Sequence, residues 1–358
     1  MSSPIARLQF ILDSAVSSGT ELGCQCAFWS DATGDVSIAA GWLDAARTRQ
    51  VTPDSLFPVF STAKAVAVTA ALRLIDRGWI SLDTRLVDLW PELVGLGRER
   101  ITLQHVLEHT TGLFCMPHAD TPEELANWTL MCSRLAAMRP AWTPGTRTKY
   151  QAFTFSWLLG EPLRRLTGKS FQEVLTDEVL APLDMASGCF FGLPDSQLPR
   201  LAALQRAPDL LPSLPPKPTF WNPTESLVCQ PAIRKACLPA FNGIANAHSL
   251  LQLGKALLDT AHLLVSPELL KNATTLHRPP DQEIPSNPGY WELFGLGYLL
   301  YANPPARGRI FGHGGYGGSE LLIDQQNRAV FAFTKNRLST DQTTREMLKT
   351  MLFRNESA

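Results

Sequence analysis

The chain has 358 residues and a mass of 39.4 kDa, which suits either two domains or one elaborate domain with an insertion. With 45% hydrophobic and 18% charged residues it has material for a globular core, which excludes a peptide hormone, a small disulfide scaffold and a disordered chain. The formal net charge of -1 lacks the basic excess of a nucleic-acid binder, so we expect a small-molecule partner and no nucleic acid.

The N-terminus and the cysteines indicate a cellular compartment. Residues 1–19 carry a single early cation, Arg7, and place Asp13 within the apolar stretch, so they lack the features of a secretory signal. No segment approaches the roughly 18 apolar residues of a membrane span. The seven cysteines are odd in number and scattered, which favours reduced thiols over a disulfide framework. We therefore expect a cytoplasmic protein without membrane contact.

The N-terminal segment predicts a helix followed by a hairpin. Apolar residues recur at helical spacing through residues 4–17. Residues 24–29 and 36–40 have strand composition and flank a turn-rich stretch, which predicts two antiparallel strands. Cys24 and Cys26 lie two residues apart in the first strand, so both side chains face one side of the sheet. We interpret them as core residues and not as part of a zinc site.

The middle of the chain predicts helices and then a loop. Residues 63–77 are rich in Ala, Val and Leu without Gly or Pro, and helical patterns follow over 125–138 and 155–166. Prolines recur through residues 207–239, where they remove helical hydrogen bonds and favour an extended loop or lid. Trp221 of this lid is a candidate ligand contact. Packing in a core is the commoner fate of tryptophan and the alternative for it, as for Trp128 and Trp142.

The C-terminal part returns to strands. Residues 294–301, 320–324 and 329–334 have strand composition, and residues 342–352 predict a closing helix. Because a lone hairpin buries too little surface to be stable, we expect both ends of the chain to share one sheet.

Ser61 and Lys64 form the sharpest local feature. They stand at the start of the helix predicted over residues 63–77, and the i, i+3 spacing places hydroxyl and amine on one helix face. A lysine whose pKa is lowered by burial or by positive charge can take the serine proton. The helix N-terminus also directs backbone N–H groups toward an oxyanion. Taken alone, such a tetrapeptide also occurs by chance on exposed helices.

Further motifs accompany this pair in order along the chain. They are Leu56–Lys64, Leu74–Gly78, Ser81–Asp83, Ile101–Leu113, Pro144–Tyr150, Gly168–Phe171, Leu180–Met185 and Gly312–Gly315. Together they resemble the serine β-lactamase and penicillin-binding-protein-like superfamily, and within it the class C-like branch that includes family VIII carboxylesterases. The resemblance implies an α/β (α+β) fold, with a mostly antiparallel sheet flanked by helices and an inserted all-helical domain.

The resemblance also implies a division of the chain and of chemical roles. We expect residues 1–60 plus 240–358 to form the sheet domain and 61–239 the helical domain, with the active site at their junction. It implies Ser61 as acyl-accepting nucleophile, Lys64 as its proton partner, and Tyr150 as a phenolate-like base or acid. No metal or organic cofactor is required.

The Gly312–Gly315 motif implies a strand that binds the substrate and the oxyanion. His313, Gly314 and Gly315 are expected to line an edge strand, where a backbone N–H joins that of Ser61. Two departures matter. Ala152 stands where β-lactamases carry an Asn, and His313-Gly314-Gly315 replaces Lys-Thr-Gly and so removes a permanent cation. Both put antibiotic hydrolysis in doubt and favour an uncharged ester or amide.

These motifs predict a serine hydrolase, a carboxylesterase for small esters that forms an acyl-enzyme on Ser61. An acyltransferase or an amidase or peptidase using the same acyl-enzyme is the first alternative, because the sequence does not specify the acceptor. A non-catalytic binding protein on the same fold is the alternative from another class.

Other nucleophile and metal patterns are weaker. Residues 105–109 read His-x-x-Glu-His, which on a helix resembles an inverted zinc-peptidase motif. We favour structural histidines, because Gly112 fits a helix end directly after them. Cys115 has no evident His partner for a thiol nucleophile, and His118 is ambiguous.

Overall fold

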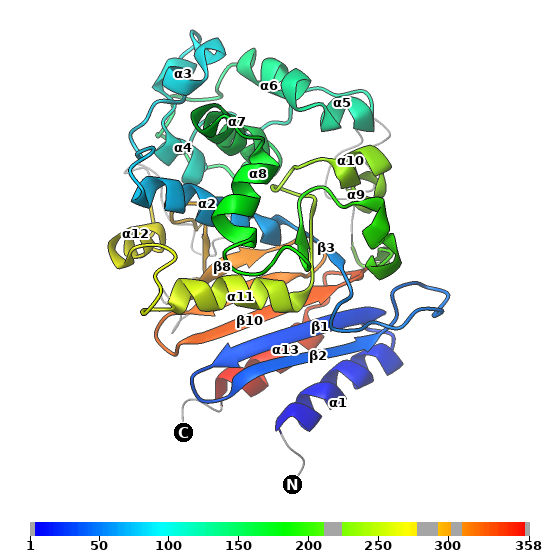
Figure 1. Ribbon diagram of the computed structural model, residues 1–358. Helices are drawn as coiled ribbons and strands as arrows, with labels where there is room; N and C mark the ends of the chain where they lie inside the picture. Colours follow the sequence, from blue (N-terminus) through cyan, green and yellow to red (C-terminus); the bar gives the residue numbers. More distant parts are fainter. Residues whose placement is uncertain (1–3, 211–223, 278–292, 302–309, 355–358) are drawn as a thin grey trace.

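The computed structural model describes residues 4–210, 224–277, 293–301 and 310–354 (Figure 1). Its helices are α1 Pro4–Ser17, α2 Lys64–Asp76, α3 Leu86–Leu89, α4 Leu103–Leu107, α5 Pro122–Ala126, α6 Trp128–Ala136, α7 Phe155–Thr167, α8 Phe171–Leu175, α9 Thr224–Cys229, α10 Pro231–Lys235, α11 Ala247–Leu258, α12 Pro267–Ala273 and α13 Thr343–Arg354. Its strands are β1 Gly23–Ser30, β2 Gly34–Gly41, β3 Phe57–Phe60, β4 Cys189–Phe190, β5 Gln205–Arg206, β6 Gly243–Ala245, β7 Leu299–Leu300, β8 Ile310–Gly314, β9 Glu320–Asp324, β10 Ala329–Lys335 and β11 Arg337–Leu338.

The main sheet joins the two ends of the chain. Its order is β2-β1-β10-β9-β8-β7, and each neighbouring pair is antiparallel. N-terminal β1 lies directly against C-terminal β10, with Ala27 opposite Ala332. The predicted sheet shared by both ends is therefore confirmed, as are the predicted helix over residues 4–17 and the hairpin that follows it.

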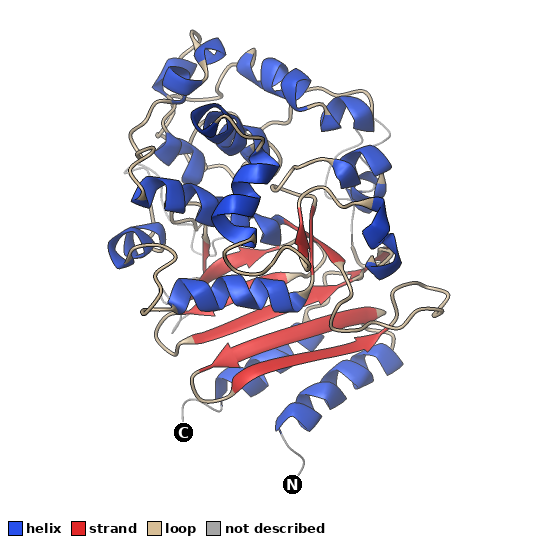
Figure 2. Ribbon diagram, in the orientation of Figure 1, coloured by secondary structure: helices blue, strands red, loops and turns tan. Residues whose placement is uncertain are grey.

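Helices cover both faces of this sheet (Figure 2). Cys24 and Cys26 project from β1 into an apolar cluster with α1 and α13, where they are buried as free thiols. Ala27 faces the other way, into the larger core beneath α11. Because side chains alternate along a strand, successive residues of β1 lie in different cores. The interpretation of the two cysteines as core residues is correct.

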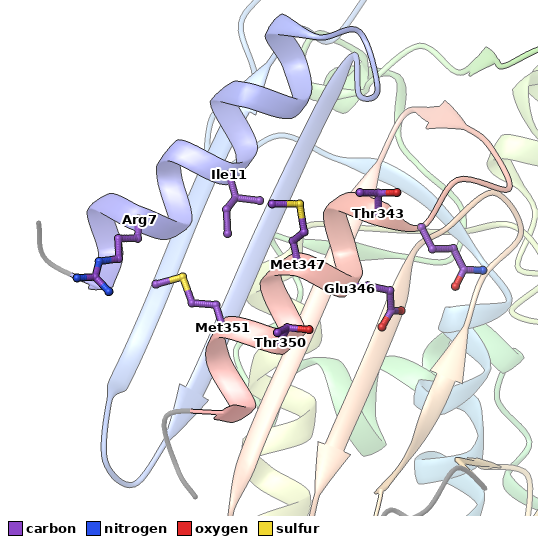
Figure 3. A pocket seen from close by; sticks show the side chains of 8 residues that line it. Arg7, Ile11, Thr343, Glu346, Met347, Thr350 and Met351 are labelled. Carbon is purple, nitrogen blue, oxygen red and sulfur yellow. The ribbon is translucent and has the colours of Figure 1, made fainter. Parts of the chain in front are cut away.

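The layer of α1 and α13 carries a surface groove of about 800 Å³ (Figure 3). Arg7 and Ile11 of α1 lie across it from Met347 and Met351 of α13. This groove lies on the opposite side of the sheet from α2 (Figure 1). It is therefore remote from the Ser61 cluster described below.

A helical block, α2 to α8, lies on the α11 side of the sheet (Figure 1). Its central helix is α2, whose first nine residues are all buried. The part spanning residues 61–239 is not wholly helical, because it also contains β4 and β5. Strand β4 joins β3 and β6 in a small sheet, and this sheet positions the chain on both sides of Ser61.

Three sequence expectations differ from the structure. Residues 125–138 do not form one helix, because Asn127 ends α5 and its side chain caps α6. Within 207–239, helices α9 and α10 replace the expected loop; Pro231 occupies the first turn of α10, where its missing N–H breaks no helical hydrogen bond. Residues 211–223 of the expected lid, with Trp221, lie outside the described residues.

The third difference is the strand expected over residues 294–301. Only Leu299–Leu300 forms β7, and Phe294 makes an isolated bridge back to Leu299. Gly297, with a φ of 81°, turns the chain between them.

Among the described residues, no helix is long and apolar enough to span a membrane.

Candidate active site

A sharp turn presents Ser61 between β3 and α2. Phe60, the last residue of β3, has a φ of 49°, which is unusual for a bulky side chain and costs about 1–3 kcal/mol. Its ring is buried and packs edge-to-face on Tyr316, with centroids 5.5 Å apart. A short 3-10 turn, Ser61–Ala63, then leads into α2. Tertiary packing therefore holds the strained residue directly before the candidate nucleophile.

Lys64 is fully buried beside Ser61. Its Nζ donates to Ser61 Oγ at 3.2 Å and to the Ala152 carbonyl at 3.0 Å, and makes a short hydrogen bond to the Ala240 carbonyl. None of these acceptors is a carboxylate. Burial without a counter-ion lowers the pKa of Lys64 well below its usual 10.5. The amine can therefore lose its proton far more easily than a surface lysine.

Tyr150 lies against the same amine. Lys64 Nζ is 4.7 Å from the centre of the Tyr150 ring, and Phe294 stacks on that ring with centroids 5.5 Å apart. Burial raises the pKa of Tyr150 above its usual 10, and a hydrogen bond with Ser61 only partly opposes this effect. Burial thus favours a neutral phenol over the phenolate form that the sequence left open.

His313 projects from β8 toward this cluster and is buried. Its Nδ1 lies 2.7 Å from the Gly314 carbonyl oxygen, so Nδ1 carries the proton and donates to it. Burial, with a further contribution from Lys64, lowers the pKa of His313 to about 3. The imidazole is therefore neutral at physiological pH. Strand β8 lies between β9 and β7, and β7 pairs with only Phe311 and Gly312 of it.

The turn after β8 is fixed to the turn that carries Ser61. Ser319 Oγ donates to the Val59 carbonyl at 2.8 Å and lies 3.1 Å from Thr62 Oγ1. A Cβ at Gly315 would lie 2.3 Å from the Val59 carbonyl oxygen, so only glycine allows this approach. The Gly315 N–H donates to Ser319 O within the turn, which removes it from the oxyanion donors. A Cβ added at Gly314 would meet no described atom within 4 Å.

Gln151, the residue after Tyr150, is hydrogen-bonded to groups other than Ser61. Its amide accepts from Thr111 Oγ1 at 2.6 Å and donates to the Val106 carbonyl at 2.9 Å. The side chain is fully buried in these contacts, beside the ring of His109. The motif therefore offers no side-chain amide to a substrate at either Gln151 or Ala152.

The two histidines of the zinc-like pattern do not share one helix. Helix α4 ends at Leu107, and His105 caps that helix together with Thr102. His109 lies beyond the helix with a φ of 58°, and its ring is 5.1 Å from that of Tyr150. The described residues contain no cluster of three or more metal-ligating side chains. His109 is thus a packing partner of Tyr150, a position that the sequence did not indicate.

The remaining candidates lie in other surroundings. Cys115 is exposed, and exposed His118 pairs with Asp120 at 2.9 Å. The Trp128 indole donates to Glu161, and that of Trp142 donates to the Thr110 carbonyl. Both tryptophans therefore have structural partners.

The sequence missed the carbonyls of Ala152 and Ala240, which bind Lys64. Backbone atoms carry no residue signature, and Ala240 is 176 positions from Lys64 in the chain. The pairing of β6 with β3, which places Gly243 opposite Phe60, brings this segment to the site.

Comparison with known proteins gives matches over nearly the whole chain. The Beta-lactamase family model matches residues 12–354. Esterase/beta-lactamase LipL of Mycobacterium tuberculosis is 28% identical over 88% of this chain and 77% of its own length. A beta-lactamase of Escherichia coli is 28% identical over 40% of this chain and 37% of its own length.

Solved structures share the fold. A family VIII carboxylesterase superposes with a TM-score of 0.83 at 23% identity, covering 99% of this chain and 98% of the other. A penicillin-binding protein homologue from Caulobacter crescentus gives a TM-score of 0.81 at 28% identity, covering 97% and 96%. The fold and the family resemblance predicted from the sequence are thus confirmed.

Proposed function

The chain belongs to the beta-lactamase family and is a serine hydrolase, and we propose that it is a carboxylesterase for small, uncharged esters that acylates Ser61. One observation carries this proposal: Ser61 Oγ lies 3.2 Å from the amine of fully buried Lys64. We place the site at the junction of the sheet part, residues 1–60 and 240–358, with the part spanning 61–239. LipL, a relative whose name includes esterase activity, supports this assignment.

The proposed acylation step uses the neutral form of Lys64. Ser61 Oγ attacks the ester carbonyl carbon while its proton passes to Lys64 Nζ. The developing oxyanion accepts a hydrogen bond from the backbone N–H of Ser61, in the turn that leads into α2. Tyr150 gives its phenolic proton to the departing alkoxide and regains one from Lys64. Attack by water on the acyl-enzyme, with the proton returned through the same groups, releases the acid.

Two features favour an ester over a β-lactam. A side-chain amide beside the nucleophile can hydrogen-bond the carbonyl of an amide substrate. Here position 152 is alanine, and the Gln151 amide is already hydrogen-bonded to Thr111 and Val106. A substrate carboxylate gains from a cation, but His313 is neutral because burial lowers its pKa to about 3. An ester without charge demands neither group.

Intact-mass measurement with p-nitrophenyl butyrate tests the proposal. We expect a butyryl adduct and nitrophenol release in the wild-type protein, and in Ser61→Ala a loss of both by about 1,000-fold or more. Thermal unfolding serves as the control for folding of the variant. A fluorophosphonate that leaves Ser61 unmodified, together with no Ser61-dependent turnover, would overturn the proposal. Added butanol or benzylamine distinguishes transfer or amide chemistry from hydrolysis by the product formed.

A further inference from the structure

Both backbone polar groups of Ala240, its carbonyl and its N–H, are hydrogen-bonded at the candidate site. Its carbonyl accepts hydrogen bonds from both Lys64 Nζ and Ser61 Oγ, the latter at 3.2 Å. Its N–H donates to Ser156 Oγ at 2.9 Å. The backbone of this one residue, through two successive peptide units, thus connects the nucleophile and the base on one side with a hydroxyl of α7 on the other.

Ser156 is completely buried and takes no part in the proposed acylation chemistry. It is the second residue of α7, and Ala240 is buried with it. A small buried hydroxyl beside a backbone N–H fixes the orientation of that peptide, because the buried N–H has no water to bind instead. The Ala240 carbonyl belongs to the next peptide unit, whose N–H, that of Phe241, donates to the Leu238 carbonyl at 3.0 Å. The two hydrogen bonds together set the direction of the Ala240 carbonyl.

The second carbonyl that binds Lys64 is held by a neighbouring contact. Phe153 and Phe241 follow Ala152 and Ala240 directly, and their rings pack edge-to-face with centroids 5.0 Å apart. This contact clamps the two carbonyl-bearing segments together. The chain thereby holds Lys64 with backbone carbonyls at the place where the related motif carries an Asn side chain.

We propose that Ser156 is a positioning residue that anchors the backbone of Ala240 through its N–H, so that the Ala240 carbonyl aligns the Lys64 amine with the Ser61 hydroxyl. This inference rests on the proposed function for its effect on turnover. Its structural part, control of Lys64 by a remote hydroxyl, stands on the geometry alone.

The sign of the effect follows from which form of Lys64 the carbonyl favours. A fixed carbonyl oxygen stabilises the ammonium over the amine, so it raises the pKa of Lys64 against the lowering effect of burial. Tyr150, His109 and His313 are the titratable side chains that face Lys64 from other segments. Burial favours the neutral form of all three, so we assign the titration in this cluster to Lys64.

The test compares Ser156→Ala with Thr154→Val. Thr154 is equally buried at the start of α7, but its hydroxyl donates to the Leu113 carbonyl at 2.7 Å and not to Ala240. We expect kcat for p-nitrophenyl butyrate to fall about 10- to 100-fold in Ser156→Ala with KM nearly unchanged. The acid limb of its pH profile moves to lower pH. Thr154→Val keeps the wild-type limb.

Carbon-13 NMR of the lysine Cε atoms provides a readout independent of turnover, with Lys64 assigned by its loss in Lys64→Met. We expect Lys64 to titrate at lower pH in Ser156→Ala than in wild type. Ser156→Cys keeps the volume with a weak sulfur acceptor, and replaces Ser156→Ala if that variant does not fold.

A Lys64 titration and a kcat both equal to wild type, or a titration shifted upward, would overturn the positioning role. Absent ester turnover in the wild type would instead contradict the proposed function, and the NMR titration would still decide the role of Ser156.

Discussion

Lys64 and Lys335 are both buried lysines, yet their surroundings differ. Lys335 of β10 donates to the buried carboxylate of Glu21 at 2.8 Å and to Ser339 Oγ at 3.1 Å. Within the described part of the chain, the acceptors of Lys64 are a hydroxyl and two carbonyls. Lys335 is therefore neutralised as an ion pair, whereas burial lowers the pKa of Lys64 and prepares it to accept a proton. The partner of a buried amine, more than its burial, decides between a structural and a chemical role.

Replacing Lys64 by Met is expected to give the largest effect on this comparison. Loss of the proton acceptor lowers kcat by about 1,000-fold. Burial lowers the pKa of Lys64 in the folded state below its value in the unfolded chain. The free energy of unfolding of the wild type therefore rises with pH toward the usual lysine pKa of 10.5. Lys64→Met lacks that rise and is at least as stable as wild type near pH 7. Urea unfolding near pH 7 and near pH 10, beside ester kinetics, measures both effects. Substantial retained turnover would contradict the base role.

Replacing Lys335 by Met reverses the pattern. The variant leaves Glu21 without its cation, which costs about 3–5 kcal/mol of unfolding free energy. Its folded fraction keeps most ester turnover, because Lys335 does not touch Ser61 or Lys64. Burial already raises the pKa of Glu21 against the pull of Lys335, so its carboxyl takes up a proton more readily in the variant and the deficit shrinks as pH falls.

Urea unfolding near pH 5 and near pH 8 checks this second prediction. The double variant Glu21→Gln, Lys335→Met serves as its control and recovers most of the lost stability. A stability equal to wild type in the single variant would show that the ion pair is dispensable.

The smallest effect is expected for His313→Gln, which sharpens the assignment of the titrating group. The imidazole is already neutral because burial lowers its pKa to about 3, so it does not titrate where the enzyme is assayed. We expect the acid limb of kcat/KM to stay at the wild-type pH, with a smaller loss of kcat than in Lys64→Met. A limb that moves in this variant would assign the titration to His313 and not to Lys64.

Much of the fold follows from local patterns in the sequence. The helical spacing of apolar residues predicts α1 with its observed bounds, and strand composition on both sides of a turn-rich stretch predicts the β1–β2 hairpin. Strand β9 matches its prediction over residues 320–324. Expectations failed where local composition is ambiguous, as in the short helices near Pro231 and the turn at Gly297. There the pairing and packing of distant segments decide the backbone conformation.

The sequence by itself determined the neighbourhood of Ser61 and Lys64, because their i, i+3 spacing at a helix start is a local property. It also indicated Tyr150 and His313 through the family resemblance. Only the tertiary structure decided which groups bind Lys64, since the carbonyl of Ala240 reaches it through the pairing of β3 with β6. Burial and the absence of a carboxylate among the partners of Lys64 are likewise products of packing. Local spacing thus brought the two groups together, but the surrounding fold set the proton affinity that their chemistry requires.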